Sequence, residues 1–188
     1  MSIAKHVKKS MKNYTCTKCG DEIPEGSEYR YFKPGYRGKV KVRRCMKPEC
    51  APRRSELTDN KMADVYAAQE DAEASIRALK WDDDEGDWAD QVGQIEELLT
   101  EAAGTAEGLI EEDEEAIQNA PMLEEQLGER RDALEEWVGE LQSFEPSDQP
   151  EEEKPEVGGD LEDWLADASE KFDRAVEEAL EILGNLAV

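Results

Sequence analysis

The chain has 188 residues, of which 38% are charged and only 6% are aromatic, and its formal net charge at pH 7 is −25. This composition leaves too little bulky apolar material for a large globular core, which disfavours a compact enzyme and favours elongated helices with narrow apolar seams. Residues 1–54 hold 15 Lys and Arg against 5 Asp and Glu, a net of +10, whereas residues 55–188 hold 8 against 43, a net of −35. We therefore expect two modules of opposite sign, with the basic one as the contact for nucleic acid.

Residues 1–13 are predicted to form a basic arm. The segment carries several lysines but lacks the apolar run of a secretory signal peptide. No stretch of the sequence approaches the ~20 apolar residues of a membrane span. We therefore expect a soluble, cytoplasmic protein without membrane contact.

Four cysteines mark a head over residues 14–54, arranged as Cys16-x2-Cys19 and Cys45-x4-Cys50. Two cysteines two residues apart on a tight turn can chelate one ion, and Gly20 supplies the backbone freedom of such a turn. In a reducing compartment the second pair would complete a tetrahedral four-thiolate site and not a disulfide framework. Zn²⁺ is the expected ion, and its role would be structural because no position stays open for a catalytic water. Two unrelated thiol pairs, or a site in which His6 replaces one cysteine, are the alternatives.

Two strands are predicted between the cysteine pairs, over residues 28–33 and 39–44, with a turn at residues 34–38. Period-two alternation places Lys39, Lys41 and Arg43 on one face, and Val40 and Val42 on the other. Tyrosines and Phe32 interleave with these cations, so they can stack on bases, or they can cover the metal core. The candidate nucleic-acid-binding residues are Lys8, Lys9, Arg30, Lys33, Tyr36, Arg37, Lys39, Lys41, Arg43, Arg44, Arg53 and Arg54.

The sequence from Tyr14 to Gly20 (Tyr-Thr-Cys-Thr-Lys-Cys-Gly), followed by Pro24-Glu-Gly-Ser-Glu-Tyr-Arg-Tyr-Phe, resembles the small zinc-ribbon proteins of tailed bacteriophages. These include part-degenerate relatives of the poly(ADP-ribose) polymerase-type zinc fingers. The resemblance covers about 40 residues and implies a zinc-stabilised, β-rich head with Cys16, Cys19, Cys45 and Cys50 as ligands. The polymerase-type fingers use a His ligand, which is missing from the second pair here. A phage-encoded chain would act in the host cytoplasm.

From residue 55 to 144 the apolar residues recur at alternating intervals of four and three, the spacing of packed amphipathic helices. Ser55 or Thr58 can cap the first helix, residues 81–86 interrupt the pattern, and Pro121 ends the second helix or starts the third. We expect an acidic coiled-coil hairpin, with the first helix as a third strand and with seams that also permit a homo-oligomer. Asp113 is off-pattern in the second seam, and Arg130 lies in the third.

Residues 145–160 have the composition of a disordered linker, and residues 161–188 form a C-terminal amphipathic helix capped by Asp160 and Asp163. Its apolar stripe can fold back on the hairpin, or it can dock into a groove of another protein. The candidate partner-binding residues on this helix are Leu161, Leu165, Phe172, Val176, Leu180 and Leu183.

The acidic helices admit three interpretations: a solvated surface, a mimic of nucleic acid, or a cover for the basic head. The chain has one His and neither a Gly-rich phosphate loop nor a nucleophile motif, which disfavours an enzyme. We predict a non-enzymatic accessory factor. Its head would contact DNA, RNA or a DNA-bound protein, and its helices would recruit or modulate a partner such as a recombinase, polymerase or transcription complex. The alternative is an acidic rod that mimics DNA and inhibits a host nucleic-acid enzyme.

Overall fold

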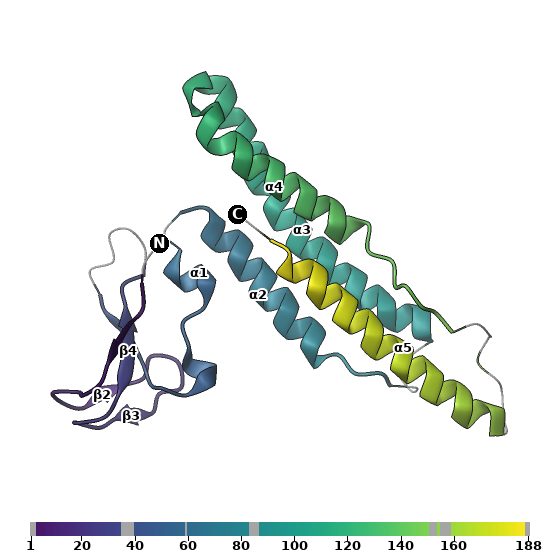
Figure 1. The fold of residues 1–188 in the computed structure, drawn as a ribbon, viewed down its shortest axis with the longest axis horizontal. Coiled ribbons are helices and arrows are strands. Elements are labelled where there is room, and N and C mark those ends of the chain that lie inside the picture. The colour runs from purple at the N-terminus through teal and green to yellow at the C-terminus, as the bar shows by residue number, and fades with distance from the viewer. Residues whose placement is uncertain are drawn as a thin grey trace. The chain divides into compact units, whose positions relative to one another are not determined.

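The computed structural model describes residues 3–34, 40–58, 60–82, 87–150, 154 and 159–186. The chain divides into two compact units, residues 1–70 and residues 71–188. Figure 1 shows that strands occupy the N-terminal part and helices the rest. The predicted order of a small β-rich head followed by helices is therefore confirmed.

Two small antiparallel sheets form the N-terminal unit. Strands β1 (Lys5–Val7), β4 (Tyr29–Phe32) and β5 (Val42–Arg44) make one sheet in the order β1-β4-β5. Strands β2 (Tyr14–Thr15) and β3 (Glu22–Ile23) make the other. The hairpin predicted between the cysteine pairs is the β4-β5 pair, with Tyr31 opposite Arg43.

Strand β1 lies in the segment that the sequence assigned to a basic arm. It pairs with β4, with Lys5 opposite Tyr31 and Val7 opposite Tyr29. The buried Ser10 continues this attachment, since its backbone N–H donates to the Ser27 carbonyl at 2.8 Å. The strand residues of the predicted arm thus belong to the sheet. A strand of three residues is too short to give a recognisable pattern in the sequence.

Strand β5 is shorter than predicted. Phe32 is the last residue of β4 and its partner is Val42, so the preceding residues have no strand to pair with. Val40 is 73% exposed and does not join an apolar face. Lys39 lies outside the described residues.

The core of this unit is small. Ile23 packs with Cys16 and Cys50, and Tyr14, Tyr29 and Cys45 border the cluster. A second buried ring, Phe32, lies beneath the Arg44 guanidinium at 5.9 Å. So few apolar side chains cannot offset the entropy of ordering the chain without a further crosslink.

Helices α1 (Arg54–Leu57) and α2 (Met62–Ala78) follow the sheets. Thr58 ends α1 and does not start a helix, and the N–H of Met62 is capped by the Asn60 side chain at 3.1 Å. The predicted N-cap at Ser55 or Thr58 is therefore wrong. The Ser55 hydroxyl instead donates to Glu70 at 2.5 Å, which joins α1 to α2.

The second unit contains a helical hairpin. Helix α3 (Trp88–Asn119) leads through the short turn η2 (Pro121–Leu123) into α4 (Glu124–Gln142), which runs back along α3 (Figure 1). Gln142 donates to Glu107 at 2.8 Å, near the open end of the hairpin. The turn at Pro121 is where the sequence predicted it. The buried residues of α3 are Trp88, Gln91, Val92, Ile95, Leu99, Ala102, Ala103, Ala106, Leu109 and Asp113.

Asp113 and Arg130 form an ion pair within this hairpin. The Arg130 Nε lies 2.8 Å from Asp113 Oδ2, and a second nitrogen of the guanidinium contacts Oδ1. The Asp113 side chain is 3% exposed and that of Arg130 is 17% exposed. The two polar residues that break the apolar pattern of the seam therefore neutralise each other's charge and meet each other's hydrogen-bonding needs.

Helix α5 (Gly159–Gly184) folds back on the hairpin and contacts both α3 and α4. The Trp137 indole N–H of α4 donates to the Ile182 carbonyl of α5 at 3.2 Å. Phe172 and Leu183, two of the predicted partner contacts, are buried and offer no docking surface here. The other four, Leu161, Leu165, Val176 and Leu180, are half-buried.

The described part of the predicted linker contacts α5. The backbone N–H of Ser147 donates to Glu178 at 3.0 Å, and Lys171 donates to the Gln149 carbonyl at 3.0 Å. Arg174 pairs with Asp148. Lys171 and Arg174 are among the few cations of the unit, so they attract this acidic segment.

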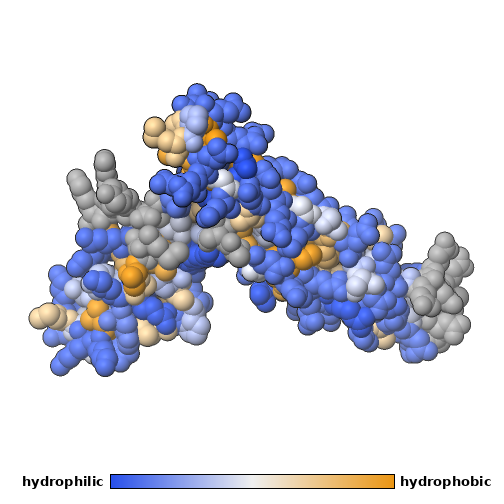
Figure 2. Space-filling model, turned by 45° about the horizontal axis from the view of Figure 1, so that its top comes forward, coloured by the Kyte–Doolittle hydropathy of each residue, from blue (hydrophilic) through white to orange (hydrophobic). Residues whose placement is uncertain are grey.

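Apolar side chains form only small patches on the face shown in Figure 2, and hydrophilic side chains cover most of it. Among the described residues, the structure contains no helix with the length and apolar character needed to cross a membrane.

Candidate metal centre and nucleic-acid interface

The four cysteines converge on one point. Their sulfur atoms all lie within 4.8 Å of one another, and the Cys19 and Cys45 sulfurs are 3.8 Å apart. A tetrahedral ion with ligand bonds of about 2.3 Å places its sulfurs about 3.8 Å apart. A disulfide would require about 2.05 Å, so this spacing excludes a disulfide and is compatible with ligands of one metal ion.

The first cysteine pair lies in a tight turn that follows β2. The Cys16 N–H donates to the Asp21 carbonyl at 2.8 Å, and the Gly20 N–H donates to the Cys16 carbonyl at 3.0 Å. Gly20 has φ +78°, a conformation that other residues rarely adopt. The predicted role of this glycine is confirmed, since the turn it allows brings Cys19 back beside Cys16.

The second pair is positioned by β5 and a short 3-10 turn. Cys45 follows the strand directly, and Cys50 ends the turn Pro48–Cys50 (η1). Thr17 donates two hydrogen bonds to the Arg43 carbonyl, one from its backbone N–H at 2.9 Å and one from its side-chain O–H at 3.0 Å. These bonds join the segment that carries Cys16 and Cys19 to the segment that carries Cys45. The position of the sulfur cluster therefore depends on contacts between both segments.

The thiols ionise unequally. Burial raises the pKa of Cys16, but backbone N–H groups of Cys19, Cys45 and Lys18 outweigh it and lower that pKa to about 6. Burial and the neighbouring thiols raise the pKa of Cys50 to about 12. One thiolate therefore forms readily, and only a bound cation would offset the repulsion among four.

His6 is not part of the sulfur cluster. Its Nε2, on strand β1, lies 3.0 Å from a carboxylate oxygen of Glu28, the residue before β4. Within the described part of the chain, the grouped metal-ligating side chains are the four cysteines. The donor set is thus all sulfur, as the spacing of the cysteines predicted.

A row of tyrosines lies beside the sulfur cluster. The Tyr14 and Tyr29 ring centroids are 5.4 Å apart, and those of Tyr29 and Tyr31 are 6.4 Å apart. Arg43 stacks over Tyr14 at 4.2 Å, and Lys41 lies over Tyr31 at 5.0 Å. We call this surface the cationic face; it comprises the three tyrosines with Lys5, Lys12, Lys33, Lys41 and Arg43.

The tyrosine rings make cation–π contacts with Lys and Arg side chains of the same chain. Arg43 and Lys12 both approach the ring of Tyr14, at 4.2 Å and 5.7 Å from its centroid. A base could stack on Tyr14 or Tyr31 only by displacing these cations. The rings therefore hold positive charge at this surface and are themselves occupied, which suits contact with phosphates and not stacking on bases.

Two of the predicted nucleic-acid contacts have structural roles instead. Arg44 is 7% exposed, because β5 places it opposite Arg30 and beside Phe32, where it pairs with Glu56 of α1. Arg54 stacks over Tyr66 at 3.7 Å and donates to its hydroxyl at 2.6 Å. The Arg44 guanidinium therefore joins the sheet to α1, and the Arg54 guanidinium joins α1 to α2.

The remaining predicted contacts divide into four groups. Lys33, Lys41 and Arg43 belong to the cationic face, while Arg30 is half-buried on the opposite face of the sheet. Lys8, Lys9 and Arg53 are exposed elsewhere on the unit. Tyr36, Arg37 and Lys39 lie outside the described residues.

The sequence-based list of contacts missed Lys5, Lys12 and Tyr14. Lys5 reaches the cationic face only because β1 pairs with β4. Tyr14 lies on β2, in the other sheet, and meets Arg43 across the contact between the two sheets. Strand pairing between distant segments, and not local spacing, brings these residues together.

Comparison with known proteins finds no family model, no curated protein and no solved structure that matches the chain. The resemblance to phage zinc ribbons therefore stays a prediction from the sequence.

Proposed function

We propose that the protein is a non-enzymatic accessory factor. In this proposal a zinc-ribbon head binds the phosphate backbone of nucleic acid, and the acidic helices recruit or modulate a protein partner. The observation that carries the proposal is the cationic face, where cations held on tyrosine rings adjoin the sulfur cluster.

Zinc is the ion that fits the donor set. Four thiolates whose sulfurs lie within 4.8 Å of one another favour Zn²⁺, and a site filled by sulfur leaves no place for a reacting water. Cys16, Cys19, Cys45 and Cys50 would hold the ion. Its role would be to crosslink β2 and β5, the strands that carry Tyr14 and Arg43, and so to maintain the cationic face.

The charge distribution on the sheet supports contact with phosphates. The pairing register places Lys5, Val7, Tyr29, Tyr31 and Arg43 on one side of the β1-β4-β5 sheet, and no carboxylate is among these strand residues. Glu28 lies beside His6, whose place on β1 alternates with Lys5 and Val7 and so faces the other side of the sheet. Such a face recognises nucleic acid without regard to sequence, because phosphates carry no base information.

The helical unit supports a separate role in binding protein. Residues 71–188 hold 7 Lys and Arg against 39 Asp and Glu, and α5 covers the apolar side of the hairpin. The surface left for a partner is therefore rich in carboxylates, which favours a partner with a basic surface. A basic DNA-binding channel of an enzyme is one such surface, so a mimic of DNA remains the alternative function.

Binding of the full chain to labelled duplex DNA over a salt series tests the proposal. Five cations on the face predict that log K falls with log salt at a slope of about −4.5. Lys41→Gln with Arg43→Gln should make the slope shallower by about 2, whereas Lys18→Gln with Lys8→Gln, outside the face, should change it less.

An absence of affinity for duplex or single-stranded DNA and RNA at low salt would overturn the nucleic-acid proposal. In that case, inhibition of a DNA enzyme by the full chain would favour the mimic. Equal effects of the two double variants would show that the cationic face has no special part.

A further inference from the structure

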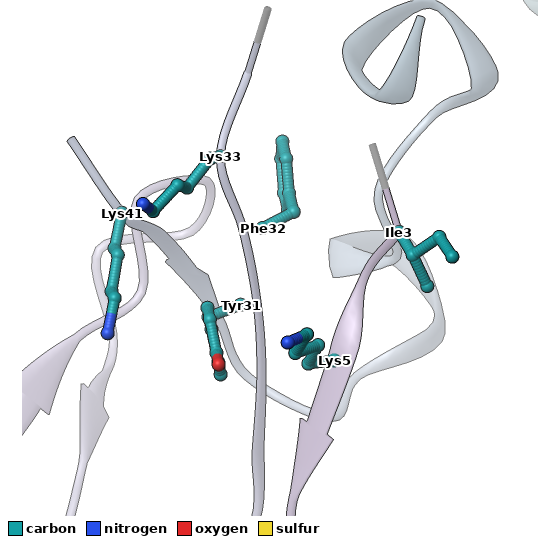
Figure 3. Close-up of a pocket in the computed structure, with 6 residues that line it drawn as sticks. All are labelled: Ile3, Lys5, Tyr31, Phe32, Lys33 and Lys41. Carbon is teal, nitrogen blue, oxygen red and sulfur yellow. The ribbon is translucent and has the colours of Figure 1, made fainter. Parts of the chain in front are cut away.

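A cavity of about 420 Å³ opens at one end of the cationic face. It lies where β1 begins, β4 ends and the chain returns toward β5, as Figure 3 shows. Its lining residues are Ile3, Lys5, Tyr31, Phe32, Lys33 and Lys41.

Three ammonium groups from three separate segments line this cavity. Lys5 lies on β1 directly opposite Tyr31, Lys33 follows β4, and Lys41 precedes β5. The Lys41 ammonium is held over the Tyr31 ring at 5.0 Å. Within the described part of the chain, no carboxylate lines the cavity or pairs with these three lysines. The site is thus built for an anion with several acceptor oxygens.

We propose that this cavity, the lysine pocket, binds a phosphomonoester. The inference deepens the proposed nucleic-acid function, on which it rests, by assigning the pocket to a terminal phosphate. A monoester carries a charge of about −1.5 to −2 at pH 7 and three acceptor oxygens. A backbone diester carries one charge, so a cavity lined by three ammonium groups favours the monoester.

The size of the pocket agrees with this ligand. A volume of about 420 Å³ lies within the range of about 300–1,000 Å³ that is usual for small-ligand sites. That volume exceeds the need of a bare phosphate and leaves room for the sugar to which a phosphomonoester is attached. A 5′-terminal nucleotide would place its phosphate among the lysines while the following phosphates continue along the cationic face.

Fluorescence anisotropy with the full chain tests the inference, using one single-stranded oligonucleotide with and without a 5′-phosphate. We expect the phosphorylated strand to bind about tenfold more tightly at low salt, because the 5′-phosphate adds a charge of about −1.5 to −2 close to three ammonium groups. Lys5→Gln with Lys33→Gln should remove this preference. Lys18→Gln with Lys8→Gln makes the same change in charge outside the pocket and should preserve it, as should Lys33→Arg.

Competition separates the possible sources of the phosphate. Nucleoside monophosphate and inorganic phosphate are each titrated against the bound strand, and metal content and far-UV circular dichroism confirm that the variants fold. Equal affinity for both strands would overturn the inference while the nucleic-acid function stands. If neither strand binds but the monophosphate binds and depends on Lys5 and Lys33, the pocket takes free nucleotides and the nucleic-acid function fails.

Discussion

The ion pair between Asp113 and Arg130 provides a quantitative test of the helical unit. Both residues occupy seam positions between α3 and α4, and the Asp113 side chain is 3% exposed. Removing one member of a buried pair leaves an uncompensated charge, which costs about 3–5 kcal/mol. Arg130 is 17% exposed and can reach water in part, so Asp113→Leu should cost about 3 kcal/mol, near the lower limit.

Replacing both members should have a different effect. The variant Asp113→Leu with Arg130→Leu extends the apolar seam, and such replacements are neutral or stabilising by about 1–4 kcal/mol. The double variant should therefore be at least as stable as the wild type. The coupling between the two positions should then exceed the loss caused by Asp113→Leu alone.

Urea unfolding followed by tryptophan fluorescence measures these differences. All four tryptophans, Trp81, Trp88, Trp137 and Trp164, lie in residues 71–188, so the signal reports on the helical unit alone. The free energy of unfolding comes from the midpoint and slope of each transition. A loss below about 1 kcal/mol for Asp113→Leu, or a double variant as unstable as the single ones, would refute the buried-pair assignment.

Three further predictions concern the head. A strong chelator should abolish nucleic-acid binding and leave the helical circular dichroism signal nearly unchanged, because the helices use no cysteine; a large loss of helix would contradict this. Tyr14→Leu should weaken binding several-fold by releasing Arg43, whereas Tyr14→Phe, which keeps the ring face, should not. Metal affinity should rise with pH above neutrality, because Cys50, with a pKa of about 12, must release its proton on binding; competition titrations at several pH values measure it.

Features with a short or periodic pattern could be predicted from the sequence. The paired spacing of the cysteines and the glycine after the first pair were enough to predict a sulfur cluster, and the structure brings the four thiols together. The alternation of four and three along α3 and α4 likewise predicted the hairpin and its turn at Pro121. In each case the interacting residues follow from local geometry, which the sequence carries directly.

Features that depend on distant pairing could not be predicted. Arg44 follows the alternation of a surface strand, yet it is buried because Glu56, twelve residues later, returns on α1 to pair with it. Lys5 lies on the cationic face because β1 pairs with β4, and the three residues of β1 have no distinctive pattern in the sequence. Whether α5 folds back on the hairpin or docks on another protein also depends on the surface that α3 and α4 present to it. The apolar stripe of α5 alone does not contain that information.

The central claim is that one metal ion held by four thiolates organises the head. Native mass spectrometry of the purified full chain, with elemental analysis of the same sample, tests it most directly. We expect one Zn²⁺ per chain, and a chain with Cys45→Ser that loses most of the metal and the folded head. A wild-type chain that binds no metal under reducing conditions, or a Cys45→Ser chain with unchanged stoichiometry and folding, would contradict the claim.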